Sequence, residues 1–143
     1  MLTTLKGKCL LDTNILVYAY NQASPFHKKA REIVLDAALG KFEAVVAQQN
    51  LIEFCNVLTD QFHIPAPSVK KDLLDITADL SVIHPLPQTI LIFADLLTNS
   101  KKGQIFDLYL AATMLDNDID NIITLNNKDF EGVKGIAVFN PWQ

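Results

Sequence analysis

Ile105-Phe-Asp-Leu-Tyr-Leu-Ala-Ala-Thr-Met-Leu115 is an apolar helical stretch with one acidic side chain, Asp107. A carboxylate among core-forming side chains is costly. Its ionised form needs a partner or a metal ion, or else its pKa rises until the group is neutral. Asp12 and Glu53 also adjoin apolar segments. Three such acids, far apart in the sequence, suggest one shared site for a divalent cation.

The segments around this stretch predict strands that alternate with helices. Strands are expected at residues 8–11, 43–47, 82–84, 121–125 and 135–139, and helices at 14–22, 26–39, 48–62, 67–80, 88–99 and 105–115. Such alternation indicates an α/β fold, a three-layer sandwich in which helices flank a short, mostly parallel sheet. No repeat or linker interrupts the pattern, so residues 1–143 are expected to form a single domain.

The candidate acids fall near the carboxyl ends of the predicted strands. Asp12 ends the first strand, Glu53 lies one to two turns into the helix after the second, and Asp107 opens the helix before the strand at 121–125. The loop after that strand carries Asn126 and Asp129. Ligand sites of such sheets form beyond the carboxyl ends of the strands, so all five side chains are expected at one edge.

The charge pattern excludes one class of nucleic-acid binder and permits another. A net charge of −4 argues against a protein that coats nucleic acid generally. It does not argue against a nuclease, because acids in a metal site lower the net charge and the bound cation offsets them locally. Lys101 and Lys102 lie just before Asp107, so they are candidates for contacts to RNA phosphates. The ordinary alternative for them is a solvated helix face.

Composition predicts a cytoplasmic protein without a membrane segment. No apolar stretch reaches the roughly 18 residues of a membrane span, and no signal-peptide pattern opens the chain. Cys9 and Cys55 lie in apolar segments and are expected to be reduced core residues. His27, His63 and His84 lack the spacing of a zinc site or a catalytic triad.

Four segments, in order, carry a family resemblance. They are Leu11-Asp12-Thr13-Asn14, Leu51-Ile52-Glu53, Asp107-Leu-Tyr-Leu-Ala-Ala-Thr113 and Thr124-Leu-Asn126-Asn-Lys-Asp129-Phe130. Together they resemble the PIN-domain ribonucleases, and in particular the VapC-type toxins of bacterial and archaeal toxin–antitoxin pairs. The resemblance spans roughly residues 9 to 140.

The resemblance implies a site and a reaction. Asp12, Glu53 and Asp107 would be acidic metal ligands, and either Asn126 or Asp129 would be the fourth. Three side chains would support them: Thr13, Asn14 and Thr124. Oxygen ligands suit Mg²⁺ or Mn²⁺, and such an ion would activate water for RNA hydrolysis that leaves a 5′-phosphate and a 3′-hydroxyl. A cognate antitoxin protein and a homodimer are implied as partners.

Other interpretations of the same residues stay open at this point. Asp12 or Asp107 could serve only as a helix cap, and Glu53 could be a solvated helix charge. Asn126 could be a turn residue and Asp129 a plain loop acid. A non-catalytic PIN-like domain that binds RNA or protein is the main functional alternative. A phosphoaspartate protein fits less well, because the paired acids typical of such proteins are absent from the opening segment.

Overall fold

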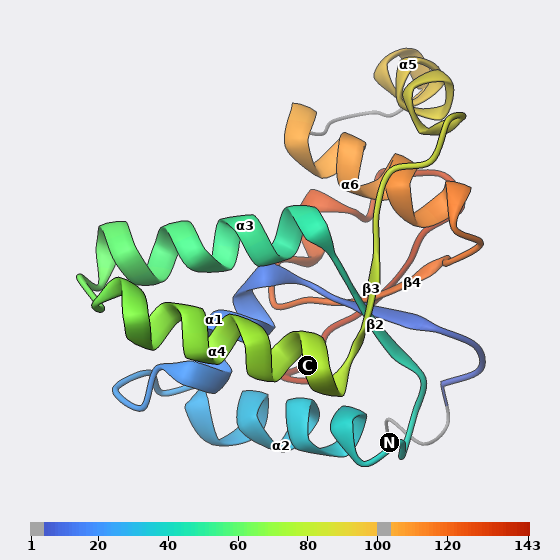
Figure 1. Ribbon diagram of the computed structural model, residues 1–143. Coiled ribbons are helices and arrows are strands. Elements are labelled where there is room, and N and C mark those ends of the chain that lie inside the picture. Colours follow the sequence, from blue (N-terminus) through green and yellow to red (C-terminus); the bar gives the residue numbers. More distant parts are fainter. Residues whose placement is uncertain (1–4, 100–103) are drawn as a thin grey trace.

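A parallel sheet forms the centre of the computed structural model, which describes residues 5–99 and 104–143 (Figure 1). Its strands lie in the order β3-β2-β1-β4-β5, and every pairing is parallel. The bounds are β1 Cys9–Leu11, β2 Ala44–Ala47, β3 Ser81–Ile83, β4 Asn121–Ile123 and β5 Ala137–Phe139. All five predicted strands form, and the predicted parallel sheet is confirmed.

Helices connect the strands as the sequence predicts. In the described residues they are α1 Thr13–Tyr20, α2 His27–Ala38, α3 Gln48–Asn56, α4 Ala66–Asp79, α5 Thr89–Asn99 and α6 Ile105–Asp116. Two short turns complete the set, the π-helical η2 Val57–Gln61 and the 3-10 turn η3 Asn127–Asp129. None of the helices in the described part of the chain has the length and apolar character needed to cross a lipid bilayer.

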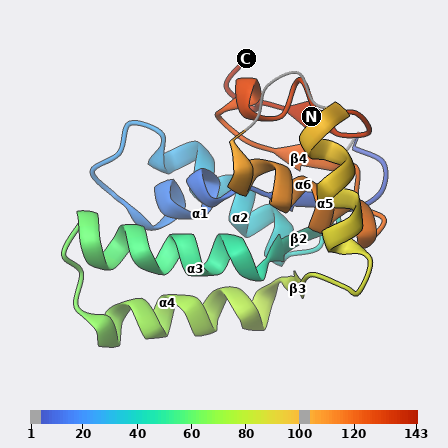
Figure 2. The same cartoon turned by 90° about the horizontal axis from the view of Figure 1, so that it is seen from above.

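The two faces of the sheet support separate apolar cores. Along β1, Cys9 and Leu11 point into a core with side chains of α1, α2, α3 and α4, whereas Leu10 points into a second core with α6. This alternation is the two-residue period of a strand. Figures 1 and 2 show α1–α4 on one side of the strands and α5 and α6 on the other. The predicted three-layer sandwich is therefore confirmed.

Helix α6 is apolar on nearly every side because it is covered on two sides. Leu110 and Met114 pack toward the sheet, while Leu108 and Ala112 pack in a further cluster with Leu96 of α5. The two residues of each pair are four positions apart and share one face of the helix, and the two faces pack in different cores. Asp107 lies in the first turn of this helix.

The helix predicted over residues 48–62 changes its hydrogen-bond pattern at Val57. From there the chain forms the π-helical turn η2, in which the Phe62 N–H donates to the Val57 carbonyl at 3.2 Å. The Thr59 hydroxyl donates to the Cys55 carbonyl at 2.9 Å, a side-chain bond that competes with the regular backbone ladder. Apolar periodicity predicts a helix here but does not distinguish the two helix types, and π turns often mark functional sites.

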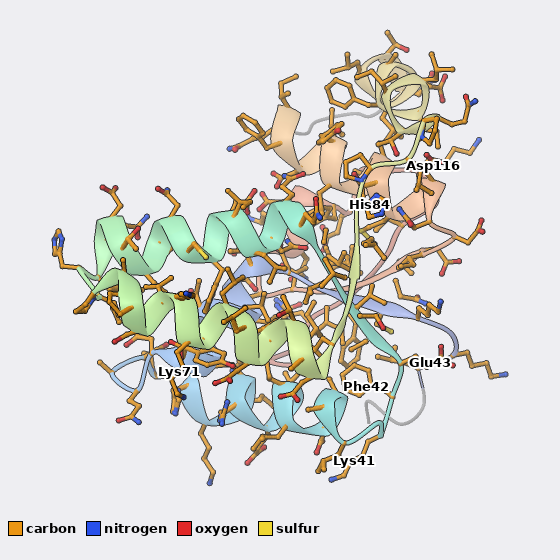
Figure 3. The ribbon with its side chains drawn as sticks, viewed as in Figure 1. Lys41, Phe42, Glu43, Lys71, His84 and Asp116 are labelled. Carbon is orange, nitrogen blue, oxygen red and sulfur yellow. The ribbon has the colours of Figure 1, made fainter. Side chains whose placement is uncertain are left out.

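The connection between α2 and β2 lies at the amino end of β2, whereas the candidate acids lie beyond the carboxyl ends of the strands. Gly40 has a φ of 74°, which favours glycine after a helix end. Lys41, Phe42 and Glu43 follow it (Figure 3), and Lys41 forms an ion pair with Asp36 at 2.9 Å. Phe42 is buried in the core shared with α1 and α2, so it anchors this turn.

Candidate functional site

Five predicted site residues line one cavity of about 310 Å³. They are Asp12, Glu53, Asp107, Asn126 and Asp129, from four separate segments of the chain. The geometry follows from topology, because β1 and β4 are neighbouring parallel strands whose carboxyl ends meet at one edge. Because four of these five side chains are acids, we name it the acid cavity.

Asp12 is held by hydrogen bonds from several directions. It is the N-cap of α1, and its Oδ1 accepts from the Thr13 N–H at 2.8 Å. Its Oδ2 accepts from the Thr124 hydroxyl at 2.8 Å and from Asn14 Nδ2 at 3.4 Å. Capping is thus one role of Asp12, but it does not account for the polar groups gathered on the other oxygen.

The pKa of the Asp12 carboxyl is raised to about 6, although several donors contact it. Burial is the main cause, and the negative charges of Glu53 and Asp129 add to it, while hydrogen bonds from Thr124 and Thr13 act in the opposite direction. Asp12 is only 9% exposed. A buried carboxylate with other acids nearby is the environment in which a cation restores the ionised form.

Glu53 is fixed at both of its oxygens. Its Oε2 accepts from the Thr13 hydroxyl at 2.8 Å, and its Oε1 accepts from Gln49 Nε2 at 3.1 Å. The side chain is half-buried and lines the acid cavity. A solvated helix charge would lack these constraints, so the surface interpretation of Glu53 does not fit the structure.

Thr124 and Asn14 connect the strand β4 to Asp12. The buried Thr124 hydroxyl donates to Asp12 and accepts from Asn14 Nδ2 at 3.2 Å and from the Asn126 N–H at 3.0 Å. Asn14 Oδ1 in turn accepts from the Leu125 N–H at 3.3 Å. The two side chains therefore fix the start of α1 against the loop after β4.

Two amide side chains of α3 also contact the acids, and sequence reasoning assigned neither a role. Asn50 is fully buried: its Oδ1 accepts from the Ala47 N–H at 3.0 Å, and its Nδ2 donates to the Thr13 hydroxyl at 3.1 Å. Gln49 Nε2 donates to Glu53 and to the Phe106 carbonyl of α6 at 2.9 Å. The available signal was the position of Asn50, one helical turn before the buried Phe54 and on the same face of α3.

Asp107 enters the acid cavity from the first turn of α6. The N-cap of that helix is Gln104, so Asp107 does not serve as the cap. Its pKa is raised to about 6, mainly by burial and then by the charges of Asp129, Asp12 and Glu53. No hydrogen bond from the described residues contributes to this pKa. The acids of the cavity therefore act on one another electrostatically across four chain segments.

Both candidates for the fourth position line the acid cavity. Asn126 and Asp129 lie in the loop after β4, and the Asp129 N–H donates to the Asn126 carbonyl at 3.2 Å. Among the charges acting on Asp107, that of Asp129 has the largest effect, and it also acts on Asp12. Asp129 therefore belongs to the same electrostatic group as the other acids.

The donor set fits a hard divalent cation. All candidate ligands are carboxylate or amide oxygens, which Mg²⁺ and Mn²⁺ prefer. Within residues 5–99 and 104–143, no three His, Cys, Asp or Glu side chains are grouped closely enough to hold a metal ion by themselves. The acids thus surround a shared space, which suits an ion that keeps several of its waters.

Two lysines and the histidines complete the groups considered in the sequence. Lys101 and Lys102 fall outside the residues that the structure describes. Figure 3 places His84 beside Asp116, at the end of α6 opposite to Asp107. A helix of 12 residues spans roughly 18 Å, so His84 is far from the acids.

The sequence matches a family model over most of its length. The model described as PIN domain matches residues 9–136. A comparison with curated protein sequences gives no match. The matched residues include every acid that lines the cavity.

Solved structures with the same fold include VapBC proteins and a VapC toxin. VapBC2 from Rickettsia felis, bound to a promoter DNA fragment, matches with a TM-score of 0.70 and 19% identity over 94% of this chain and 98% of that one. VapBC-1 from nontypeable Haemophilus influenzae has a TM-score of 0.70 and 17% identity, over 96% and 100% of the two chains. VapC20 of Mycobacterium tuberculosis, a toxin that cleaves the sarcin–ricin loop, has a TM-score of 0.59 and 15% identity, over 80% and 86%. At such identities the likeness shows the fold.

Proposed function

The chain belongs to the PIN domain family, and from that premise we propose that it is a metal-dependent endoribonuclease and the toxin of a type II toxin–antitoxin pair. One observation carries the proposal: acids from four segments line a single cavity, and their charges add to burial in raising the pKa of Asp12 and of Asp107. Crowded carboxylates that are ionised repel one another, and a bound cation offsets that repulsion. The substrate class, RNA, comes from the resemblance of the four sequence segments.

In this proposal Asp12, Glu53, Asp107 and Asp129 hold Mg²⁺ or Mn²⁺. Asp129 takes the fourth position because its charge acts on both Asp12 and Asp107, and Asn126 is the neutral alternative. A bound ion would supply an activated water and stabilise negative charge at the phosphate.

The other polar residues of the site position these acids. Thr124 and Asn14 orient the Asp12 carboxylate, and Thr13 with Gln49 orients Glu53. Such fixed orientation means that the ligands need little rearrangement when an ion binds. The acids would therefore bind the ion, and the neutral side chains orient those acids through hydrogen bonds.

We also propose that the protein acts in the cytoplasm, as a homodimer that a cognate antitoxin protein inhibits. The neighbouring folds include toxin–antitoxin complexes. Helix α5 exposes Ile90, Leu91 and Leu97, with 58%, 63% and 44% of their surfaces accessible. Apolar side chains gathered on one exposed helix support a protein contact there.

The test is cleavage of a structured RNA by the purified protein in Mg²⁺ or Mn²⁺. We expect cutting that stops with a chelator and leaves 5′-phosphate ends. Cutting that continues unchanged in excess chelator would contradict the metal-dependent mechanism.

A non-catalytic PIN-like domain that binds RNA or protein is the second candidate. The observation that favours it is the spacing of the acids, which form no close group of three within the described residues. For such a domain, RNA binds and is recovered intact after incubation with Mn²⁺. Sequencing gels and a binding assay on the same samples distinguish the two candidates.

A further inference from the structure

A second cavity, of about 400 Å³, adjoins the acid cavity across the side chain of Phe62. This volume lies within the range of small-molecule sites in proteins. The side chains around it are uncharged: Tyr20, Asn21, Gln22, Leu58, Phe62 and Ile64. Burial raises the pKa of the Tyr20 hydroxyl above its usual value, so this group is neutral too. An acidic and an uncharged cavity therefore share one aromatic wall.

The π-helical turn η2 places Phe62 between the two cavities. The Phe62 N–H donates to the Val57 carbonyl at 3.2 Å, and the Ile64 N–H donates to the Leu58 carbonyl at 2.9 Å. His63, with a φ of 53°, ends the helix between them. Despite these constraints Phe62 is 42% exposed. A large apolar ring that is held in place beside an acidic cavity is available to a ligand.

The uncharged cavity carries two kinds of group that recognise nucleobases. Phe62 and Tyr20 are aromatic, and the Tyr20 ring is oriented by edge contact with Phe54, at 5.5 Å between centroids. Asn21 and Gln22 carry amides, and Asn21 Oδ1 accepts from the Ala23 N–H at 3.2 Å, which orients that amide. Aromatic faces stack on bases, and amides pair with the donors and acceptors of base edges.

We propose that the uncharged cavity is a nucleobase subsite, in which Phe62 stacks on the base of an unpaired nucleotide next to the phosphate that is cut. The inference rests on the proposed ribonuclease function, because it places the scissile phosphate in the acid cavity. An RNA strand in this position sends its charged backbone toward the cation and its uncharged base across Phe62. The lining, which has no charge, suits a base better than a phosphate or a charged peptide side chain.

The subsite defines the substrate class as RNA with an unpaired nucleotide at the cut. In a duplex the base is paired and stacked, so it cannot enter a cavity beside the backbone. A loop or a single strand presents the base without that cost. We therefore expect cutting in loops and single strands, and none within a continuous RNA duplex.

The experiment combines an enzyme variant with a substrate variant. A single-stranded RNA is made with one abasic nucleotide at each position around the cut, and KM and kcat are measured for the wild type and for Phe62→Ala. We expect one abasic position that raises KM about ten- to hundredfold, and a similar rise for Phe62→Ala on the intact RNA. On the RNA with that abasic position, Phe62→Ala should cause no further loss, because both changes remove the same contact.

Two further variants control for indirect effects. Phe62→Trp keeps a stacking surface and should retain a KM near that of the wild type. Leu39→Ala removes another exposed apolar side chain, at the end of α2 with 72% of its surface accessible, and should leave KM unchanged. Additive losses from Phe62→Ala and the abasic position, or a wild-type KM for Phe62→Ala, would overturn the inference.

Binding measured without cutting separates this inference from the proposed function. The dissociation constant of the same RNA is measured by fluorescence anisotropy in the Asp107→Asn variant, with and without Phe62→Ala. If the wild type cuts no RNA but binding depends on Phe62 and on the same base, the subsite stands and the nuclease proposal fails. If RNA binding is independent of Phe62 while Phe62→Ala frees the protein from its antitoxin, the cavity serves a protein partner and the inference fails.

Discussion

Asp12 and Asp107 have carboxyl pKa values raised to about 6, but the structure holds the two side chains in different ways. Asp12 is buried at the end of β1 and accepts hydrogen bonds from Thr13, Thr124 and Asn14. Asp107 is partly exposed in the first turn of α6, and no hydrogen bond from the described residues lowers its pKa. The Asp12 carboxyl therefore stabilises the fold and also lines the acid cavity, whereas the Asp107 carboxyl only lines the cavity.

This difference predicts which substitutions lower activity without lowering the stability of the fold. Changes around Asp12 remove contacts that also join β1, α1 and β4, so stability and activity should fall together. A change at Asp107 removes a charge that other acids repel, so activity should fall without loss of stability.

Substitution of Asp107 should have the largest effect on activity. We expect Asp107→Asn to lower kcat for RNA cleavage by about 10²–10³ or more, because it removes a metal ligand at the reacting phosphate. The melting temperature in chelator should stay the same or rise. Asp118→Asn is the matched control, since Asp118 is exposed and its φ of 59° is well tolerated by Asn. A melting temperature that drops with activity would remove the distinction between the two acids.

Substitution of Thr124 should lower activity and stability together. Thr124→Val keeps the shape of the side chain but leaves Asp12 without its hydroxyl donor. We expect a loss of about 10- to 100-fold in kcat and of about 1–3 kcal/mol in the free energy of unfolding. Urea denaturation and cleavage kinetics measure the two losses, and Thr98→Val on the exposed face of α5 is the control. Full activity in Thr124→Val would show that Asp12 needs no support from the segment that follows β4.

Substitution of Gln49 should lower activity with little change in stability. Gln49→Met removes the donor that joins Glu53 to the Phe106 carbonyl, and we expect kcat to fall about tenfold. The same change removes Gln49 Oε1, a buried acceptor without a partner in the described structure, which offsets part of the lost stability. Gln48→Met, at the exposed neighbouring position, should behave as the wild type. The Mn²⁺ concentration for half-maximal activity should rise only in Gln49→Met.

The pH dependence of stability should show the smallest effect. Both carboxyls have folded-state pKa values of about 6, above the ordinary 3.8, so their protonation stabilises the folded chain. That contribution is fully present below about pH 4 and is lost as pH rises through 6. In chelator, the melting temperature of the wild type relative to Asp107→Asn should therefore fall between pH 4.5 and 7.5. Saturating Mn²⁺ should reverse this trend, since the ion binds the ionised carboxyls.

Periodicity and strand-end reasoning predicted most of the fold and brought the five site residues to one edge. The strands and α6 were predictable because their apolar runs have clear periods and ends. The π turn at Val57 was not, because its hydrogen-bond pattern leaves the apolar spacing nearly unchanged. Gln49 and Asn50 were missed because polar residues in the first turn of a helix look solvated until the packing partners of that turn are known.

Direct binding of Mn²⁺ tests the central claim, that the four acids form one cation site. Isothermal titration calorimetry at pH 7.5, without RNA, compares the wild type with Asp107→Asn and Asp118→Asn. We predict that the wild type and Asp118→Asn bind Mn²⁺ with equal affinity and that Asp107→Asn binds it at least about tenfold more weakly. Equal Mn²⁺ affinity in all three proteins would contradict the account.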